Sequence, residues 1–268
     1  MKHVHFLLLF ILFGLSCSEP ELLLDNELDP GNPDYDPPET SIIYTIPALD
    51  EQGIIVDDNI TLFWEGNAED MEFRYRLDEA LWTMWDSTTI TSFTYLNEGV
   101  HIFIVQGRYP SGVVDKNPDT LAFIVDAVSG PALMFYPRRN FAEQGETVIF
   151  QILAEEVIDL MAAEIHLTFD PSLLQIESVI QGSLFQNGQE SLFSYDINVQ
   201  DGTVEILTTL IDNENPSVSG TGVLMAIHVG LLQPANAEIS FTGGDIFRDP
   251  ENNNITILEK INGLVELE

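Results

Sequence analysis

Apolar and polar residues alternate in short runs along most of the chain after residue 40, and Gly, Asn, Asp and Pro separate these runs. A period of two is typical of β-strands that bury one face of a sheet. The runs recur at intervals of about ten residues between 41 and 127, as in antiparallel sandwiches, and they are longer between 130 and 268. The pattern therefore predicts an all-β protein made of two consecutive β-sandwiches.

The first predicted sandwich covers residues 41–127. Strands are expected at 59–66, 71–78, 81–87, 99–109 and 120–127. Alternation within "FRYRLD" points Phe73 inward and Arg74 outward. Three tryptophans, Trp64, Trp82 and Trp85, fall in these runs and are interpreted as core and edge packing. A sugar-stacking platform is the alternative.

The second predicted sandwich covers residues 130–268, with strands expected within 145–157, 160–185, 202–212, 219–232, 237–247 and 261–268. Their length and their polar turns favour a larger antiparallel sandwich, and a jelly roll fits about 140 residues.

Two strands of the second half have especially regular patterns, "AEIHLTF" and "TVEILTTL". Burial of each large apolar side chain stabilises the fold by about 1.5 to 3 kcal/mol, which fixes the register. The inward positions are Ala163, Ile165, Leu167, Phe169, Val204, Ile206 and either Thr208 or Leu210. The outward positions are Ala162, Glu164, His166, Thr168, Glu205, Leu207 and Thr209. These seven outward residues are the candidate partner-binding face.

The N-terminus predicts export. An apolar run from Phe6 to Leu15 follows Lys2 and is roughly half of the ~20 residues that span a bilayer, so residues 1–16 are expected to be a signal peptide. The run ends at "GLSC", which resembles a lipobox, with Cys17 as the lipidated residue and Gly14 where the family usually has Leu. Acyl chains would tether the protein to a membrane, at the outer membrane or cell surface, without spanning it. An ordinary secretory signal is the alternative. Residues 17–40, rich in Pro, Asp and Glu, are expected to form an extended tether.

Composition excludes several functions. The formal net charge is -35, with nine basic and 44 acidic residues, so the chain lacks the basic clusters that bind nucleic acid or anionic lipid. No phosphate loop or nucleophile motif is present, and the histidines stand alone without the ligand spacing of a zinc site. The acidic stretches 212–216 and 249–254 lack the spacing of a calcium loop and are interpreted as turns. We therefore expect no enzyme, no metal and no cofactor.

The first half resembles the immunoglobulin-like or fibronectin type III-like modules of bacterial surface proteins, on the strength of "ITLFWEG", "FRYRLDEALWTMW", "LNEGVHIFIVQGR" and "PDTLAFIVDA". The resemblance implies an immunoglobulin-like β-sandwich that acts as a spacer or lateral contact.

The second half resembles a cohesin domain, of type I rather than type II. The resemblance rests on an ordered set of signals: aromatic-Asp-Pro at 169–171, "LLQIESVIQG", "GTVEI", "SGTG" and "NGLVEL". It implies that the outward face binds a dockerin-bearing exported protein whose calcium belongs to the partner. The family's Asp position holds Glu164 and its Asn position holds Ala162, so the carboxylate acceptor is kept and the amide donor is lost. The implied role is surface assembly or polysaccharide degradation.

Two other functions stay open from the sequence. A jelly roll can also bind polysaccharide directly, and fold alone does not decide between the two. The chain could also be a structural surface component without a specific ligand.

Overall fold

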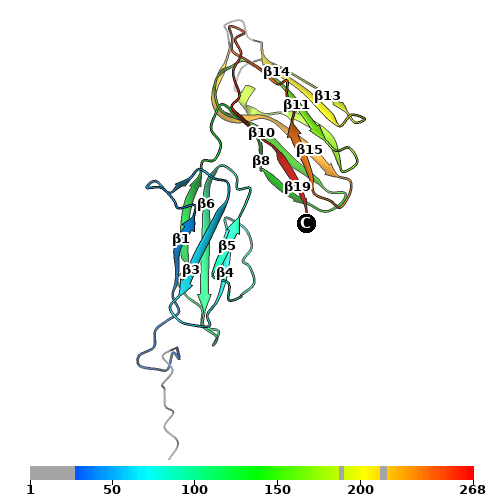
Figure 1. The fold of residues 1–268 in the computed structure, drawn as a ribbon. Helices are drawn as coiled ribbons and strands as arrows, with labels where there is room; N and C mark the ends of the chain where they lie inside the picture. Colours follow the sequence, from blue (N-terminus) through cyan, green and yellow to red (C-terminus); the bar gives the residue numbers. More distant parts are fainter. Residues whose placement is uncertain (1–27, 187–189, 212–215) are drawn as a thin grey trace, which may run out of the picture.

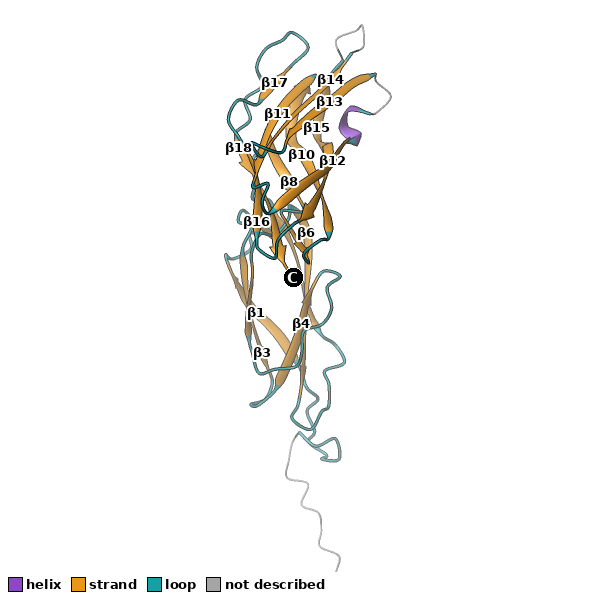
Figure 2. Ribbon diagram, turned by 90° about the vertical axis from the view of Figure 1, so that its right-hand side faces the viewer, coloured by secondary structure: helices purple, strands orange, loops and turns teal. Residues whose placement is uncertain are grey.

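The computed structural model describes residues 28–186, 190–211 and 216–268. These residues form two β-sandwiches joined end to end, as both views of the chain show (Figures 1 and 2). Each sandwich has its own cluster of buried side chains, one containing Trp64 and Phe103 and the other containing Phe150 and Ile165. The predicted all-β class is confirmed. The signal peptide, Cys17 and the first part of the predicted tether lie outside the described residues.

The N-terminal sandwich has a three-stranded and a four-stranded sheet. The order of the first sheet is β1 (Thr40–Ile46), β3 (Ile60–Gly66) and β5 (Ile90–Phe93). The order of the second is β2 (Ile54–Ile55), β7 (Asp119–Val125), β6 (Gly99–Arg108) and β4 (Glu72–Leu77). Trp64 is 2% exposed and lies against Phe73, Tyr75 and Phe103 in the centre of this core. Its aromatic ring is thus used for packing.

The predicted strand at 81–87 is wrong. Apart from a single bridge between Phe73 and Asp86, this segment is irregular. Its two tryptophans lie on outward arginines of the neighbouring strands: the Arg74 guanidinium is 4.7 Å from the ring centres of both Trp82 and Trp85, and Arg108 is 4.6 Å from Trp85. Cation–π contacts of this kind hold the segment in place of a strand ladder. These ring faces are therefore occupied by guanidinium groups.

Part of the stretch expected to be an extended tether packs against the N-terminal sandwich. Leu28 and Tyr35 lie against its core, and the Tyr109 hydroxyl donates to the Asp36 carbonyl at 3.0 Å. Apolar residues inside an otherwise polar stretch explain the difference, because they gain from burial next to Tyr109. Residues 28–39 are thus a docked arm.

The C-terminal sandwich places a five-stranded sheet against a larger one (Figure 2). The first has the order β12 (Leu174–Gln181), β15 (Val218–Leu231), β10 (Thr147–Leu160), β8 (Ala132–Tyr136) and β18 (Glu259–Ile261). The second has the order β13 (Ser191–Asn198), β14 (Thr203–Leu210), β11 (Ala162–Phe169), β16 (Ala237–Phe241), β19 (Gly263–Leu267) and β9 (Arg139–Ala142), and β17 (Ile246–Arg248) also pairs with β11. One short 3-10 helix, η1 (Ser183–Phe185), follows β12.

The expectation of purely antiparallel sheets is wrong at three strand pairs. β18 pairs with β8, β19 with β9 and β2 with β7 in parallel. In the C-terminal sandwich, the strands at the start of the domain, β8 and β9, pair with the strands at its end, β18 and β19. Each of the two sheets is therefore completed by one strand from each end of the domain.

Direct contacts join the two sandwiches. The Arg138 guanidinium pairs with Asp58 at 2.7 Å, with side chains 11% and 19% exposed, and the Arg138 amide donates to Asn97 at 2.8 Å. A small apolar cluster of Val128, Ala132 and Met134 lies beside this pair in sequence. The junction is therefore both polar and apolar.

Glu98 lies next to Asn97 and is half-buried. Burial raises its pKa from 4.5 to about 7, and the nearby Asp126 and Glu155 carboxylates add to the rise. The Ala127 amide, which donates to Glu98 at 3.2 Å, acts in the opposite direction. Glu98 therefore keeps its proton up to a higher pH than an exposed glutamate does.

Within the part of the chain that the structure describes, no helix has the length and apolar character that crossing a membrane requires.

A candidate protein-binding face on the C-terminal sandwich

The outer surface of β13, β14, β11 and β17 forms one continuous face, which we call the outer face. Burial alternates strictly along β11 and β14, so the predicted inward and outward positions are confirmed, and Thr208 and Leu210 are both buried. Strand pairing arranges the outward side chains in rows. One row holds Ser194, Leu207, Glu164 and Ile246, and the adjacent row holds Leu192, Thr209, Ala162 and Arg248.

Two apolar side chains are exposed on the outer face, Leu207 on β14 and Leu192 on the edge strand β13. Leu207 is 38% exposed and Leu192 is 50% exposed, although neither contributes to the core. A shallow hollow of about 310 Å³ opens beside Leu207 and is lined by residues that include Glu164, Ser194 and Asp196. An accessible apolar centre with a polar surround is the usual composition of a protein-binding surface.

The ends of β11 and β14 are fixed by the motifs that the sequence shows there. The Phe169 amide donates to the Gly202 carbonyl at 2.8 Å, which joins the aromatic-Asp-Pro turn to the start of "GTVEI". Gly202 has a φ of +64°, and a side chain there would place its Cβ 2.2 Å from the Phe169 carbonyl oxygen. Glycine is needed at this position for both reasons. The two motifs therefore fix where the face ends.

Acidic groups surround His166 on the outer face. Its Nε2 atom lies 3.3 Å from the Glu164 carboxylate and its Nδ1 atom 3.6 Å from Asp245. Glu205 is directly opposite His166 on β14. The centre of the face therefore carries more acidic than basic groups and favours a positively charged partner.

An ion pair between the buried Asp245 carboxylate and the partly exposed Lys260 side chain lies next to His166. The Asp245 side chain is 1% exposed, pairs with the Lys260 ammonium group and accepts a hydrogen bond from the His166 amide at 2.6 Å. The Thr242 amide donates to the His166 carbonyl at 2.8 Å. The segment between β16 and β17 is thus tied to both sides of His166.

All seven predicted face residues lie on the outer side, but sequence reasoning missed the two flanking strands. Leu192, Ser194 and Asp196 on β13 and Ile246 and Arg248 on β17 extend the face. The alternation of "SLFSYDIN" could have indicated β13, whereas the three residues of β17 are too few to show a pattern.

His101 is 7% exposed and bonds to Asp78 at 2.8 Å and to the Asn97 carbonyl at 2.9 Å. Among residues 28–186, 190–211 and 216–268, no three His, Cys, Asp or Glu side chains gather as metal ligands would. The 249–254 stretch is a turn in which Asp249 accepts from the Asn253 amide at 2.7 Å, and most of 212–216 lies outside the described residues.

The fold and the outer face together define a β-sandwich binding module. Comparison with known families agrees, since residues 138–266 match the family described as "Cohesin domain". Residues 138–266 are therefore a cohesin domain, a non-catalytic binding module. The curated proteins contain no match to the chain.

Solved structures similar to this chain include cohesins of several kinds. A non-cellulosomal cohesin from the archaeon Archaeoglobus fulgidus is 20% identical, covers 51% of this chain and 90% of its own, and has a TM-score of 0.43. A type I cohesin–dockerin complex from Clostridium thermocellum is 19% identical, covers 51% and 98%, and has a TM-score of 0.45. A type II cohesin from Acetivibrio cellulolyticus is 13% identical, covers 50% and 94%, and has a TM-score of 0.45.

Proposed function

We propose that the cohesin domain of this chain captures a dockerin-bearing exported protein on the outer face of β13, β14, β11 and β17. The observation that carries the proposal is the accessible apolar centre at Leu207 within a face of regular, well-supported strands. A stable interface buries about 800 Å² on each partner, so all four strands would contribute.

The charge of the face indicates the chemistry of the partner. Glu164 on β11 lies directly opposite Leu207, Glu205 precedes Leu207 by two residues on β14, and Asp196 on β13 is paired with Glu205. These carboxylates can accept hydrogen bonds from basic side chains or from the amides of a docked helix. A partner that carries its own calcium fits this acidic surface, and the chain supplies no cofactor.

We also propose that the protein is exported and lipid-anchored through Cys17 after removal of residues 1–16, at the outer membrane or cell surface. Residues 41–127, which we interpret as an immunoglobulin-like or fibronectin type III-like module, act as a spacer between the lipid anchor and the outer face. The three-stranded and four-stranded sheets of this sandwich support the reading. A type I-like cohesin is supported because the helical content of the described residues is limited to the three-residue η1, without the extra helix of the type II form.

Capture by purified protein tests the binding proposal. Immobilised full-length protein is exposed to a purified dockerin-bearing protein with calcium, and again after chelation. We expect retention with calcium and release after chelation, because the calcium belongs to the partner. A panel of type I and type II dockerins that all fail to bind would contradict the proposal. Radiolabelled fatty acid incorporation into wild type and Cys17→Ser tests the anchor separately.

A further inference from the structure

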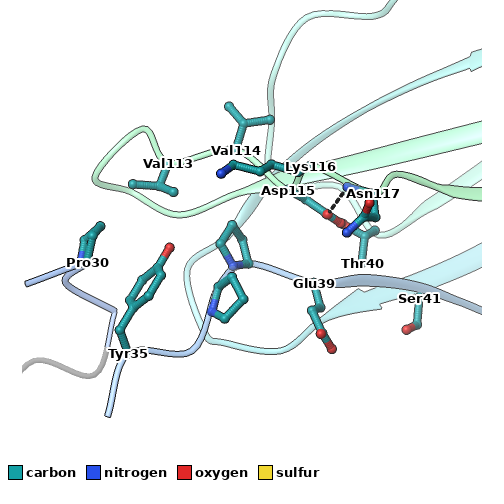
Figure 3. Close-up of a pocket in the computed structure, with 12 residues that line it drawn as sticks. Pro30, Tyr35, Glu39, Thr40, Ser41, Val113, Val114, Asp115, Lys116 and Asn117 are labelled. Carbon is teal, nitrogen blue, oxygen red and sulfur yellow. Dashed lines mark hydrogen bonds between the residues drawn. The ribbon is translucent and has the colours of Figure 1, made fainter. Parts of the chain in front are cut away.

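A second candidate site lies in the N-terminal sandwich, far along the chain from the outer face. A cavity of about 540 Å³ opens between the docked arm and the loop that joins β6 to β7. Its size falls within the range of small-molecule sites, about 300 to 1,000 Å³. Figure 3 shows Tyr35 of the arm on one side, with Val113 and Lys116 of the loop on the other.

The lining combines apolar ring surfaces with polar groups, and the Lys116 side chain is among those without an ion-pair partner in the described residues. Tyr35, Pro37 and Pro38 supply flat apolar surface. The polar part is formed by Asp115 and Lys116, which lie together at the wall of the cavity. The described residues provide no ion pair for Lys116, although the chain has 44 acidic side chains.

Asp115 is unusual for a carboxylate because it is 3% exposed. Its Oδ1 atom accepts from the Asn117 amide at 2.8 Å, and its Oδ2 atom has no hydrogen-bond partner among the described residues. Buried polar atoms without a partner are rare in folded proteins, and many mark a place where a ligand, ion or water binds. This Oδ2 atom is buried behind the wall of the cavity, whereas the exposed side chains of Glu39 and Lys116, which line the cavity, supply an acceptor and donors.

We propose that this cavity binds a carbohydrate of mono- or disaccharide size. A sugar ring has apolar faces that pack on Tyr35 and the prolines, and its hydroxyl groups both donate and accept. Each hydroxyl could give a hydrogen bond to the carboxylate side of the wall and take one from the ammonium or amide side. Asp115 and Glu39 disfavour an anionic ligand, and a lining that holds both carboxylates and an ammonium group suits a neutral ligand that donates and accepts.

The site is independent of the proposed capture of a dockerin, because it uses only residues 30–41 and 113–117. Titration calorimetry and saturation-transfer NMR on the full chain, with cellobiose, xylobiose and chitobiose as probes, test it. We expect saturable binding of at least one disaccharide. Lys116→Met keeps the length of the stem and removes the donors, and we expect it to weaken binding by about tenfold.

Val113→Trp fills the cavity and should abolish binding. Val100→Trp is the matched control, because Val100 is 68% exposed on β6 and does not line the cavity. Its affinity should equal that of wild type. The proposal is overturned if none of the three sugars shows saturable binding, or if both Lys116→Met and Val113→Trp bind as wild type does. If Val113→Trp does not fold, the Lys116→Met result decides, because Lys116 is exposed and unpaired.

Discussion

Replacement of Leu207 by Asn tests the assignment of the outer face most directly. Leu207 is 38% exposed, so its burial is incomplete and contributes about 1 to 2 kcal/mol of the 1.5 to 3 kcal/mol that a fully buried Leu provides. Asn is neutral and adds no charge beside Glu164 and Glu205. We expect the variant to fold, with a melting temperature lower by several degrees.

Leu207→Asn should weaken partner binding much more than it lowers the stability of the fold. A central apolar anchor of an interface costs about 2 kcal/mol or more when it is removed, which corresponds to roughly a 30-fold rise in Kd. Biolayer interferometry with a dockerin-bearing protein, at a temperature well below both melting transitions, measures this change. Melting is followed by circular dichroism on the same samples.

Ile180→Asn is the matched control for this experiment. Ile180 is 51% exposed on β12, an edge strand of the opposite sheet, so its replacement removes a similar amount of apolar contact away from the outer face. Both variants should lose similar stability, and only Leu207→Asn should lose affinity. A Leu207→Asn protein that binds within threefold of wild type, or an Ile180→Asn protein that loses as much, would refute the assignment.

Three further predictions concern charged groups. Glu164→Arg reverses a charge on the outer face and should weaken dockerin binding with little effect on melting, and an unchanged Kd would count against a role in binding. Lys260→Met removes one partner of the buried Asp245 carboxylate and should lower the free energy of unfolding in urea by about 1 to 3 kcal/mol, with partial recovery when Asp245→Asn is added. The pKa of Glu98 is raised to about 7 in the native state, so the native state binds this proton more tightly than the unfolded state does. Stability therefore declines as pH rises from 4.5 through 7. Glu98→Gln removes the titrating group and should flatten this loss of stability between about pH 5 and about pH 8. Equal pH profiles for wild type and Glu98→Gln would contradict this assignment.

Local patterns were sufficient for the strands whose two faces differ most in environment. β11 and β14 carry large apolar residues at every second position, and a shift of one residue would bury Glu164 and expose Ile165. Their faces could therefore be predicted from the sequence alone. The segment 81–87 contains β-favouring residues as well, but its tryptophans gain more by lying on Arg74 and Arg108 than by extending the sheet.

The ion pair between Asp245 and Lys260 could not be predicted, because it depends on contacts between distant parts of the chain. Asp245 is 15 residues from Lys260 and 79 from His166 in sequence. Nothing in the local sequence distinguishes this aspartate from the other acidic residues. The position of β17 could not be predicted either, because it is set by pairing with β11 across the sheet.

The position of β8 has a mechanical consequence. β8 is the strand through which the chain enters the C-terminal sandwich, and it lies between β10 and β18, with hydrogen bonds to both. If the protein is held at its N-terminal side while a partner pulls on the outer face, tension along β8 would load many backbone hydrogen bonds together in shear. Such a strand yields only when two ladders break at once, whereas a strand at the margin of a sheet can peel off one bond at a time.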